Sequence, residues 1–512
     1  MKHKIAVIDL GSNSVRMIIM RINENGSYIM MEQVKEMVRL SEGLQTGGRL
    51  LEEPVNRTIQ TLKLFQRLLV SSQVDAVYPV ATEAVRRAEN RDWFVELVQN
   101  ETGFIFDVID GLKEAYYDYL GVINTIKCDN FVLLDTGGGS SEIVLVRDKQ
   151  LVNGISIPYG SITLTDTFSD TGSLNAREYE KAAKFMREQY QKLDWLQDGL
   201  HLPVIGLGGS IRTLVKVEKR KKKRPYEALH NFKVSYDAVK SFKKGVLAMP
   251  PEERKQIAGM DSQRADIITA GILPLDTLMR YIGAEQLIVS GNGLREGVFF
   301  EKYAELTGRD RVVDNCTEQS IYNIIKNYNL NVKHAEHVRD LSLKLFDAAR
   351  PLHGFGNVER ELLSISAFLH DIGKCVNYYN HEKHGFYLVL NCQINGLTYP
   401  ELVRCAYIVS MHRVKEIKNG EKEFGKLLPE TTFRELKKVA IFLQIAEQLD
   451  ASEMQNLLDL DCNVTDHAFV INVSNDADVE LEINNARKLS RIFEKLYSRS
   501  LEIKYAGGQK DE

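Results

Sequence analysis

Apolar residues in the first three hundred positions come in short runs that alternate with amphipathic stretches, a rhythm typical of α/β domains. Residues 2–9 form a strand-like run that enters a glycine turn, and the run VRMIIMRI follows as its hairpin partner. The same pattern returns at residues 130–139, where NFVLLDTGGG is followed by the alternating stretch 140–148. We therefore expect an internal repeat of two similar halves within this region.

Further strands and helices complete each half of the expected repeat. In the first half, residues 74–82 predict a strand leading to a helix, and residues 101–122 predict a strand, a turn and a helix. In the second half, residues 202–216 and 287–304 each predict a strand that passes through glycines into a helix. A break near residues 123–129 separates the halves.

The strand pattern fades after about residue 310, and helical periodicity follows. It covers the segments 316–349, 358–372, 383–394, 400–413 and 433–456. The tail alternates like two strands and then continues like a helix and a strand. The sequence thus predicts an α/β protein of two similar halves, an all-α domain and a small α+β module. The expected boundaries are 1–124, 125–305, 306–458 and 459–512.

Composition narrows the class of protein. The 512 residues are 44% hydrophobic and 27% charged, which excludes disordered and collagen-like chains. No apolar run approaches the roughly 20 residues that a membrane span needs. Six scattered cysteines without paired spacing fit a reducing compartment. We expect a cytoplasmic protein that does not bind membranes.

Glycine turns at the ends of predicted strands carry the first candidate chemistry. They are DLGSNS at 9–14, DTGGGSSE at 135–142 and GLGGS at 206–210. Backbone amides in such turns converge on phosphate oxygens, and glycine permits the close approach. A plain tight hairpin is the alternative for each turn taken alone. The candidate phosphate-binding residues are Gly11, Ser12, Asn13, Ser14, Gly137, Gly138, Gly139, Ser140, Gly208, Gly209 and Ser210.

Asp9 and Asp135 begin the first two of these motifs and would face each other across a cleft. Carboxylates repel phosphate, so their expected role is to hold Mg²⁺, which in turn bridges phosphate oxygens. The sequence therefore predicts a magnesium-assisted phosphate site between the two halves.

The motifs together resemble a known family. DLGSNS, DTGGGSSE, GLGGSIRTL and SGNGLREGV, in this order, are similar to the exopolyphosphatase and guanosine pentaphosphate phosphohydrolase family of the actin-like ATPase superfamily. ATEAVR (81–86) and IDGLKEAYYDYLG (109–121) match the phosphatase branch of that superfamily. The resemblance implies two ribonuclease H-like halves and linear polyphosphate or guanosine pentaphosphate as the substrate, with a homodimer as the expected assembly.

The resemblance also implies roles for three residues. Glu114 matches the family's catalytic glutamate, which acts as general base on the attacking water. Glu142 matches a second acid near that water, and Arg86 matches an arginine that contacts the scissile phosphate. Lys113 stands where relatives often have another acid, and we expect it to be a solvated helix residue.

A basic run, KRKKKRPY at 219–226, is the largest local patch of positive charge in a chain whose net charge is −4. We expect a flexible loop that binds the distal part of a polyphosphate, with a merely solvated loop as the alternative. Only Tyr226 and Phe232 interleave with the cations, which argues against a nucleic-acid module.

Histidines crowd the predicted helical domain, where seven of the eleven lie between residues 334 and 412. Imidazoles and carboxylates on separate helices can build a metal site in a bundle. The set resembles the HD phosphohydrolase superfamily, named for its His-Asp pair. The resemblance implies a second divalent metal, Mn, Fe or Mg, bound by His337, His370, Asp371 and Asp450, with His384 and His412 available for a further one. His334, His353 and His381 are expected to be structural or to lie outside the ligand set.

Three functions stay open at this stage. The first is a Mg²⁺-dependent exopolyphosphatase that releases terminal orthophosphate. The second is a guanosine pentaphosphate 5′-phosphohydrolase, and the third is a polyphosphate or alarmone sensor that regulates a helical HD phosphohydrolase. A sugar kinase is disfavoured because no sugar-binding acid or long adenosine loop is apparent.

Overall fold

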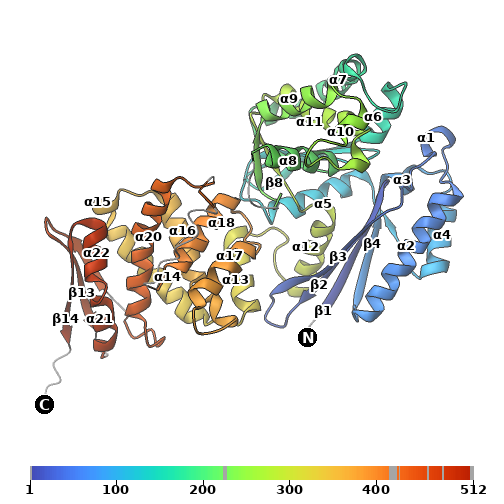
Figure 1. The fold of residues 1–512 in the computed structure, drawn as a ribbon. Coiled ribbons are helices and arrows are strands. Elements are labelled where there is room, and N and C mark those ends of the chain that lie inside the picture. The colour runs from blue at the N-terminus through green and yellow to red at the C-terminus, as the bar shows by residue number, and fades with distance from the viewer. Residues whose placement is uncertain are drawn as a thin grey trace. The chain divides into compact units, whose positions relative to one another are not determined.

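The structure is a computed structural model that describes residues 3–222, 228–413, 424–425, 427–457, 460–475 and 478–507 (Figure 1). The chain divides into two compact units, Met1–Thr317 and Glu318–Glu512. The finer division into four domains stays a prediction. Among the described residues, no helix is long and apolar enough to cross a membrane.

The first unit begins with a five-stranded sheet, sheet A, in the order β3-β2-β1-β4-β5. Its strands are β1 (His3–Leu10), β2 (Ser14–Ile22), β3 (Tyr28–Met37), β4 (Ala76–Ala81) and β5 (Asp107–Val108). The first three strands pair antiparallel, whereas β4 and β5 add in parallel. The apolar run and hairpin partner expected from the sequence are β1 and β2.

Sheet B of the same unit repeats this plan, in the order β10-β11-β9-β6-β7-β8. Its strands are β6 (Phe131–Thr136), β7 (Ser141–Arg147), β8 (Gln150–Ile157), β9 (Val204–Leu207), β10 (Phe232–Ser235) and β11 (Gln286–Val289). Three antiparallel strands are again followed by two parallel ones, with β10 added at the edge. The predicted internal repeat is confirmed.

The helices of the first unit cover both sheets. They are α1 (Leu44–Gly47), α2 (Glu52–Ser71), α3 (Glu83–Arg87), α4 (Arg91–Thr102), α5 (Gly111–Ile123), α6 (Ser161–Phe168), α7 (Ala176–Gln191), α8 (Gly209–Lys221), α9 (Tyr236–Leu247), α10 (Pro251–Arg254), α11 (Ile268–Ile282) and α12 (Leu294–Thr307). Short 3₁₀ turns lie at Asp194–Gly199 and Ser262–Arg264. One apolar core joins α5 and α12 to both sheets, and a second packs α2 and α4 on the other face of sheet A.

Helices α5 and α12 cross at glycines. A Cβ on Gly121 would collide with the carbonyl oxygen of Gly293, and one on Gly297 would collide with the carbonyl of Tyr117. Backbones can approach this closely only where no side chain intervenes. The crossing fixes the ends of both halves against each other.

The second unit is mainly helical. Its helices are α13 (Cys316–Asn327), which starts at the boundary, α14 (Val332–Ala348), α15 (Arg350–His353), α16 (Asn357–Leu369), α17 (His381–Asn391), α18 (Tyr399–Ser410), α20 (Glu430–Leu449), α21 (Glu480–Arg487) and α22 (Ser490–Tyr497), with a 3₁₀ turn at Ile372–Cys375. The helical stretch expected over 316–349 is interrupted after α13, where Asn329 has a left-handed φ of 58°.

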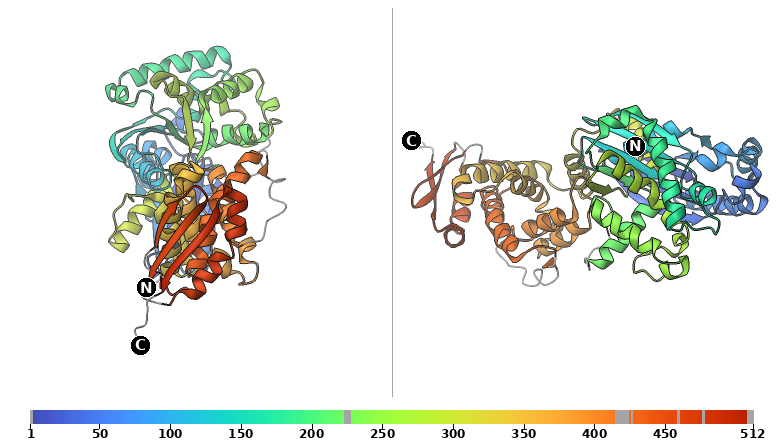
Figure 2. Two further views of the ribbon diagram at one scale, coloured as in Figure 1. Left: turned by 90° about the vertical axis from the view of Figure 1, so that its left-hand side faces the viewer. Right: turned by 90° about the horizontal axis from the view of Figure 1, so that it is seen from above.

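A small sheet, sheet C, completes the second unit in the order β12-β13-β14 (Figure 2). Its strands are β12 (Leu460–Val464), β13 (Ala468–Asn475) and β14 (Ser500–Gly507). Helices α21 and α22 pack between strand β14 and helix α20, with contacts to each. The C-terminal module therefore shares one hydrophobic core with the helices of this unit. The all-α part and the α+β tail expected from the sequence are both present.

The glycine crossing can be tested by stability. We expect Gly121→Ala to lower the free energy of unfolding of the first unit by about 1–3 kcal/mol, because the added methyl group has no room. Gly245 in α9 is the matched control: nothing lies within 4 Å of an added Cβ. There the same change should stabilise by about 0.5–1 kcal/mol. Both tryptophans, Trp93 and Trp195, lie in the first unit, so urea titrations followed by tryptophan fluorescence report it selectively. Equal effects at the two positions would contradict the close crossing.

Candidate functional site

Two turns of identical backbone construction face the cleft between sheets A and B. In the β1–β2 turn the amide of Gly11 donates to the carbonyl of Ser14 at 3.1 Å. In the β6–β7 turn the amide of Gly137 donates to the carbonyl of Ser140 at 3.0 Å. The repeat of the sequence is therefore a repeat of hydrogen bonding at the strand ends.

The carbonyl groups of the first turn accept hydrogen bonds from the segment that follows β3. The carbonyl of Ser12 accepts from the amide of Ser41 at 3.0 Å, and that of Asn13 accepts from the amides of Val38 and Arg39 at 3.1 and 3.0 Å. Within the described part of the chain, the amides of Ser12 and Asn13 donate to no other group. The turn can present donors to an anion.

The second turn is held in the same way by the start of α6. The carbonyls of Gly137 and Gly138 accept from the amides of Ser161 and Ile162 at 3.0 and 2.8 Å. Gly160, just before α6, permits this packing because a Cβ there would lie 2.6 Å from the carbonyl of Gly138. The second turn thus also directs its amides away from its bonded carbonyls.

The third glycine turn leads from β9 into α8. Gly208 has a φ of 98°, and a Cβ on it would lie 2.5 Å from the carbonyl oxygen of Thr136. Gly209 begins α8, whose first amides have no partners within the helix and suit an anion. Gly208 and Gly209 line the cleft, whereas the side chain of Ser210 is buried beside it.

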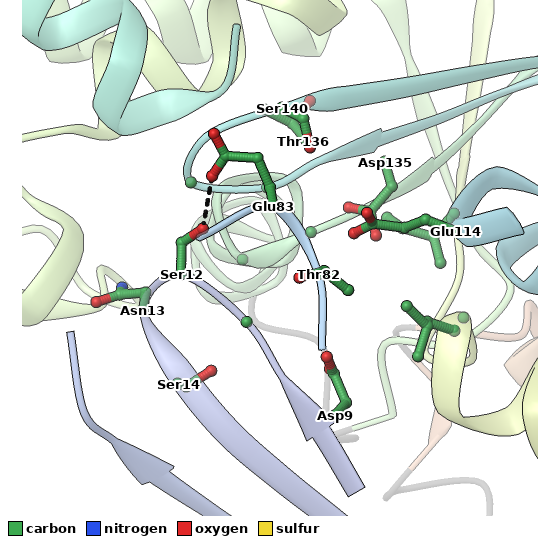
Figure 3. Close-up of a pocket in the computed structure, with 18 of the residues that line it drawn as sticks. Asp9, Ser12, Asn13, Ser14, Thr82, Glu83, Glu114, Asp135, Thr136 and Ser140 are labelled. Atoms are coloured by element: carbon green, nitrogen blue, oxygen red, sulfur yellow. Dashed lines mark hydrogen bonds between the residues drawn. The ribbon is translucent and has the colours of Figure 1, made fainter. Parts of the chain in front are cut away.

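Asp9 ends β1 and Asp135 ends β6, in corresponding positions of the two halves, and both line the cleft (Figure 3). Burial raises the pKa of both carboxyl groups. Arg16 lowers the pKa of Asp9 in part, and Arg212 does so for Asp135. Two partly screened carboxylates in one cleft offer oxygen ligands of the kind that Mg²⁺ prefers.

Glu114 lies in the first turn of α5 and is free to face the cleft because Asp110 caps the helix. The Asp110 carboxylate accepts from the amide of Lys113 at 2.8 Å. Nη1 of Arg86 lies 3.2 Å from Oε2 of Glu114 and also donates to the carbonyl of Ile109 at 2.7 Å. Arg86 is therefore held where it orients Glu114.

Glu142 lies deeper, opposite Asp135 in the β6–β7 register. Burial, followed by the Asp135 carboxylate, raises the pKa of Glu142 to about 7, although a hydrogen bond of 2.7 Å from Ser156 lowers it. Burial and then Glu142 raise the pKa of Glu114 well above its ordinary value. Such a shift brings a carboxylate closer to the range of a general base at neutral pH.

The structure brings most of the predicted cleft residues together. Those that line the cleft are Asp9, Gly11, Ser12, Asn13, Ser14, Glu114, Asp135, Gly137, Gly138, Gly139, Ser140, Gly208 and Gly209. Arg86, Glu142 and Ser210 do not line it. Arg86 reaches it through Glu114, and the other two are buried next to lining residues.

Four arginines of the cleft were not selected from the sequence: Arg16, Arg212, Arg264 and Arg295. Asp9, Arg16 and Lys35 are cross-strand neighbours on β1, β2 and β3. Burial, followed by Arg16 and Arg264, lowers the pKa of Lys35 to about 8. This crowding of cations suits an anionic ligand. Arg212 and Arg295 belong to the motifs GLGGSIRTL and SGNGLREGV, but the motifs alone do not show that the two side chains meet in the cleft.

Asp118 is another cleft-side residue that the motif analysis did not select. It lies one helical turn after Glu114 on α5 and is 1% exposed. Neither of its carboxylate oxygens has a hydrogen-bond partner among the described residues. Burial, followed by the carboxylates of Asp135 and Glu142, raises its pKa well above the ordinary value. The helical spacing of four from Glu114 was the available signal.

The second unit contains a buried cluster of metal-ligating side chains. Two groups bring their ligand atoms within 4.8 Å of one another, namely His334, His370 and Asp371, and Asp371, His381 and His412. Nε2 of His334 lies 3.2 Å from Nε2 of His370, and Nε2 of His381 lies 2.9 Å from Nε2 of His412. Asp371 is common to both groups, with Oδ2 toward the first pair and Oδ1 toward His381.

The Nδ1 atoms of all four histidines are engaged outside the cluster. Those of His370, His381 and His412 face the carbonyls of Ala367, Tyr378 and Val409 at 2.7, 2.8 and 2.6 Å, and that of His334 faces Asp450 at 2.7 Å. A ring held through Nδ1 presents Nε2 as a ligand, which is how proteins orient metal-binding histidines. Each of the two groups could therefore hold a metal ion between its rings.

The cluster differs from the predicted ligand set at three positions. His334 and His381 belong to it, whereas the ligand groups found among the described residues contain neither His337 nor His384. Oε2 of Glu447 lies 3.4 Å from Nε2 of His370 and has no hydrogen-bond partner among the residues that the structure describes. Asp450 instead contacts Nδ1 of His334, the nitrogen that faces away from the cluster. In each case the residue that faces the cluster lies three positions before the predicted one, on the same face of the helix and one turn away. His353, expected to be structural, stacks on Phe346 at 4.2 Å.

Only part of the basic run 219–226 lies within the described residues. Lys219, Arg220 and Lys221 end α8, so the run does not begin as a loop. Lys219 is 5% exposed and donates to the carbonyl of Ala228 at 3.2 Å. Residues 223–226 lie outside the described part, and the polyphosphate-binding role of the run stays a prediction.

Comparison with known proteins gives one consistent result. The sequence matches the Ppx/GppA phosphatase family over residues 18–306, and domain III of the Ppx/GppA phosphatases over residues 317–491. The guanosine-5′-triphosphate,3′-diphosphate pyrophosphatase of Aeromonas hydrophila is 26% identical over 405 residues, which is 77% of each chain. The protein of the same name from Vibrio parahaemolyticus is 28% identical over 403 residues, again 77% of each chain.

Solved structures resemble about three fifths of the chain. A Ppx/GppA family member from Aquifex aeolicus is 31% identical with a TM-score of 0.53, over 60% of this chain and 99% of that one. An exopolyphosphatase from Cytophaga hutchinsonii is 25% identical with a TM-score of 0.54, over 61% of this chain and all of that one.

Two repeated halves around a phosphate-type cleft, with a positioned glutamate and arginine, define a phosphohydrolase of the actin-like ATPase fold. The chain belongs to the Ppx/GppA phosphatase family and is a hydrolase of phosphoric anhydrides.

The unpartnered carboxyl of Asp118 makes a testable contribution to stability. Its pKa is raised on folding, so it stabilises the fold below its ordinary pKa of about 4 and that contribution is lost as pH rises through the folded value. The free energy of unfolding of Asp118→Asn, measured relative to that of the unchanged protein, should therefore be higher at pH 8 than at pH 5. Urea titrations of both proteins with a chelator present measure this difference.

Asp276→Asn is the control for the loss of a partnered buried carboxylate. Asp276 accepts from Lys243 at 2.8 Å and from Tyr179 at 3.1 Å. Its replacement should cost about 1–3 kcal/mol at both pH values. If Asp118→Asn destabilises as much as Asp276→Asn at pH 8, the inferred cost of ionising the buried Asp118 carboxyl is wrong.

Proposed function

We propose that this protein is an exopolyphosphatase that transfers the terminal phosphoryl group of linear inorganic polyphosphate to water and releases orthophosphate. The observation that carries the proposal is the lining of the cleft. Glycine turns and four arginines line it, and none of its lining residues in the described structure is aromatic. Such a lining suits a chain of phosphates better than a purine base, which is commonly held by stacking.

The residues have distinct roles in this reaction. Amides of the two strand turns receive the oxygens of the terminal phosphate, and Glu114 holds the attacking water and accepts its proton. Arg86 orients Glu114 through the contact of 3.2 Å and adds positive charge near the phosphate. Arg16, Arg212 and Arg264 hold the next phosphates of the chain.

Asp9 and Asp135 are the residues proposed to hold Mg²⁺. Their burial, raised pKa values and position at the two strand ends fit a hard cation with oxygen ligands. When bound, Mg²⁺ would neutralise charge on the phosphate oxygens.

Guanosine pentaphosphate is the second candidate substrate, because the curated relatives described above carry that activity in their names. The chemistry at the terminal phosphate would be the same. Rates on long-chain polyphosphate and on guanosine pentaphosphate, measured side by side, separate the two. A higher kcat/KM on the nucleotide would overturn the preference for polyphosphate.

Glu114→Ala tests the cleft chemistry itself. We expect kcat to fall by about 10²–10⁴-fold with polyphosphate binding retained, because a general base is lost and the turns are untouched. Lys113→Ala is the matched control, since Lys113 is next to Glu114 but its side chain forms a surface ion pair with Asp107 at 2.8 Å and lies over the ring of Tyr117 at 5.8 Å. Turnover that survives Glu114→Ala would refute the assignment.

We also propose that the second unit binds divalent metal at the cluster around Asp371. The orphaned oxygens of Asp371 and Glu447 and the inward Nε2 atoms support this. Burial lowers the pKa of His370, but the carboxylates of Asp371 and Glu447 raise it to about 9, which shows how strongly this cluster favours a positive charge. Bound metal would supply Lewis-acid chemistry for phosphate esters.

Metal quantitation on protein purified without chelator tests this centre. We expect about two equivalents of transition metal in the unchanged protein, a large loss in Asp371→Ala, and no loss in His384→Ala, which removes a histidine outside the cluster. Less than about 0.2 equivalents in the unchanged protein would contradict the proposal.

The regulated-sensor alternative has its own signature. Metal-dependent hydrolysis that survives Glu114→Ala but is lost in Asp371→Ala would place catalysis in the second unit. The homodimer and the cytoplasmic location expected from the sequence stay predictions.

A further inference from the structure

Glu83 is a buried carboxylate in the cleft that the catalytic scheme does not use. It begins α3, lines the cleft and is 4% exposed. Its Oε2 accepts a hydrogen bond of 2.9 Å from the hydroxyl of Ser12, drawn as a dashed line in Figure 3. Its Oε1 accepts from Nη1 of Arg87 at 2.7 Å.

The same carboxylate also lies against the second glycine turn. A Cβ on Gly139 would overlap the Glu83 carboxylate, with the carbon and both oxygens closer than any side chain tolerates. Ser12 belongs to the β1–β2 turn and Gly139 to the β6–β7 turn. One acidic group therefore touches both turns that present amides to the cleft.

At this position the Glu83 carboxylate offers the two turns the same kind of anionic oxygen that a bound phosphate would offer. Turns that direct amides and a hydroxyl into a concavity attract anions in general, and they do not distinguish a carboxylate from a phosphate oxygen. Arg87 supplies the counter-charge, and its side chain is 39% exposed. The carboxylate can thus move toward Arg87 and the surface while it keeps its ion pair.

We propose that Glu83 is an internal anion that competes with the terminal phosphate for the two turns and so sets the affinity of the cleft for substrate and product. In the substrate-free protein it holds Ser12 and covers Gly139. When phosphate binds, the carboxylate withdraws toward Arg87 and the hydroxyl of Ser12 donates to a phosphate oxygen instead. The inference rests on the proposed function only in that the two turns bind phosphate.

Replacement of Glu83 by glutamine separates charge from shape. Inorganic phosphate is the probe, titrated calorimetrically into the full-length protein with Mg²⁺ present. We expect Glu83→Gln to bind phosphate about tenfold more tightly, because a like charge beside the ligand is gone. KM for polyphosphate should fall by a similar factor, whereas kcat changes far less. A residue that merely supports the fold would not produce this split.

Two further variants keep the test decisive. Glu83→Asp keeps the charge and should stay close to the unchanged protein in phosphate affinity. Arg87→Gln leaves the carboxylate without its counter-charge and should weaken phosphate binding, so its result stands even if Glu83→Gln folds poorly. Glu89→Gln removes an equal charge from an exposed position outside the cleft and should change nothing.

Phosphate affinity in Glu83→Gln that equals or falls below that of the unchanged protein would overturn the inference, as would tighter binding in Arg87→Gln. These failures differ from failure of the proposed function. If the cleft assignment were wrong, polyphosphate turnover would be absent or insensitive to Glu114→Ala. If only the inference were wrong, turnover would respond to Glu114→Ala and phosphate affinity would ignore the charge at position 83.

Discussion

Helices α5 and α12 can lie against each other only because glycine stands where their backbones meet. Gly121 faces Gly293, and Gly297 faces Tyr117. These helices end the two halves of the first unit, so their crossing decides how the halves face each other. It places Glu114 over the ends of β6 and β7 and brings the loop before α12 to the cleft. Because this contact leaves no room for a side chain, the position of Glu114 depends on a contact between two backbones.

The cleft that results concentrates opposite charges at short range. Carboxylates gather on the α5 side, and guanidinium groups from β2, α8 and α12 gather beside them. Arg264 and Arg295 are paired with Asp261 and Glu296. Within the described part of the chain, Arg16 and Arg212 form no such ion pair, so their charge is available to an entering ligand. Such a site lowers the stability of the fold, because its charges are arranged to bind anions and cations and not to neutralise one another.

The sequence was sufficient for the fold and for the glycine turns, because strand alternation and repeated motifs are local signals. It could not identify Arg16, Arg264 or Glu83, since their convergence depends on sheet register and on loops far apart in the chain. In the second unit the histidine pattern located the cluster and three of its members, His370, Asp371 and His412, but elsewhere it selected residues one helical turn away from those that face the cluster. Positions three apart lie on one helix face, and only packing decides which side chain points inward.

The starts of α5 and α12 are similar in sequence, GLKEA at 111–115 and GLREG at 293–297. In α12 the glutamate, Glu296, folds back onto the amide of Gly293 at 2.9 Å and serves as the cap of its own helix. In α5 that task belongs to Asp110, so the corresponding glutamate, Glu114, is released to meet Arg86. One duplicated acid thus became structural in one half and chemical in the other, and the difference is an aspartate in place of Asn292.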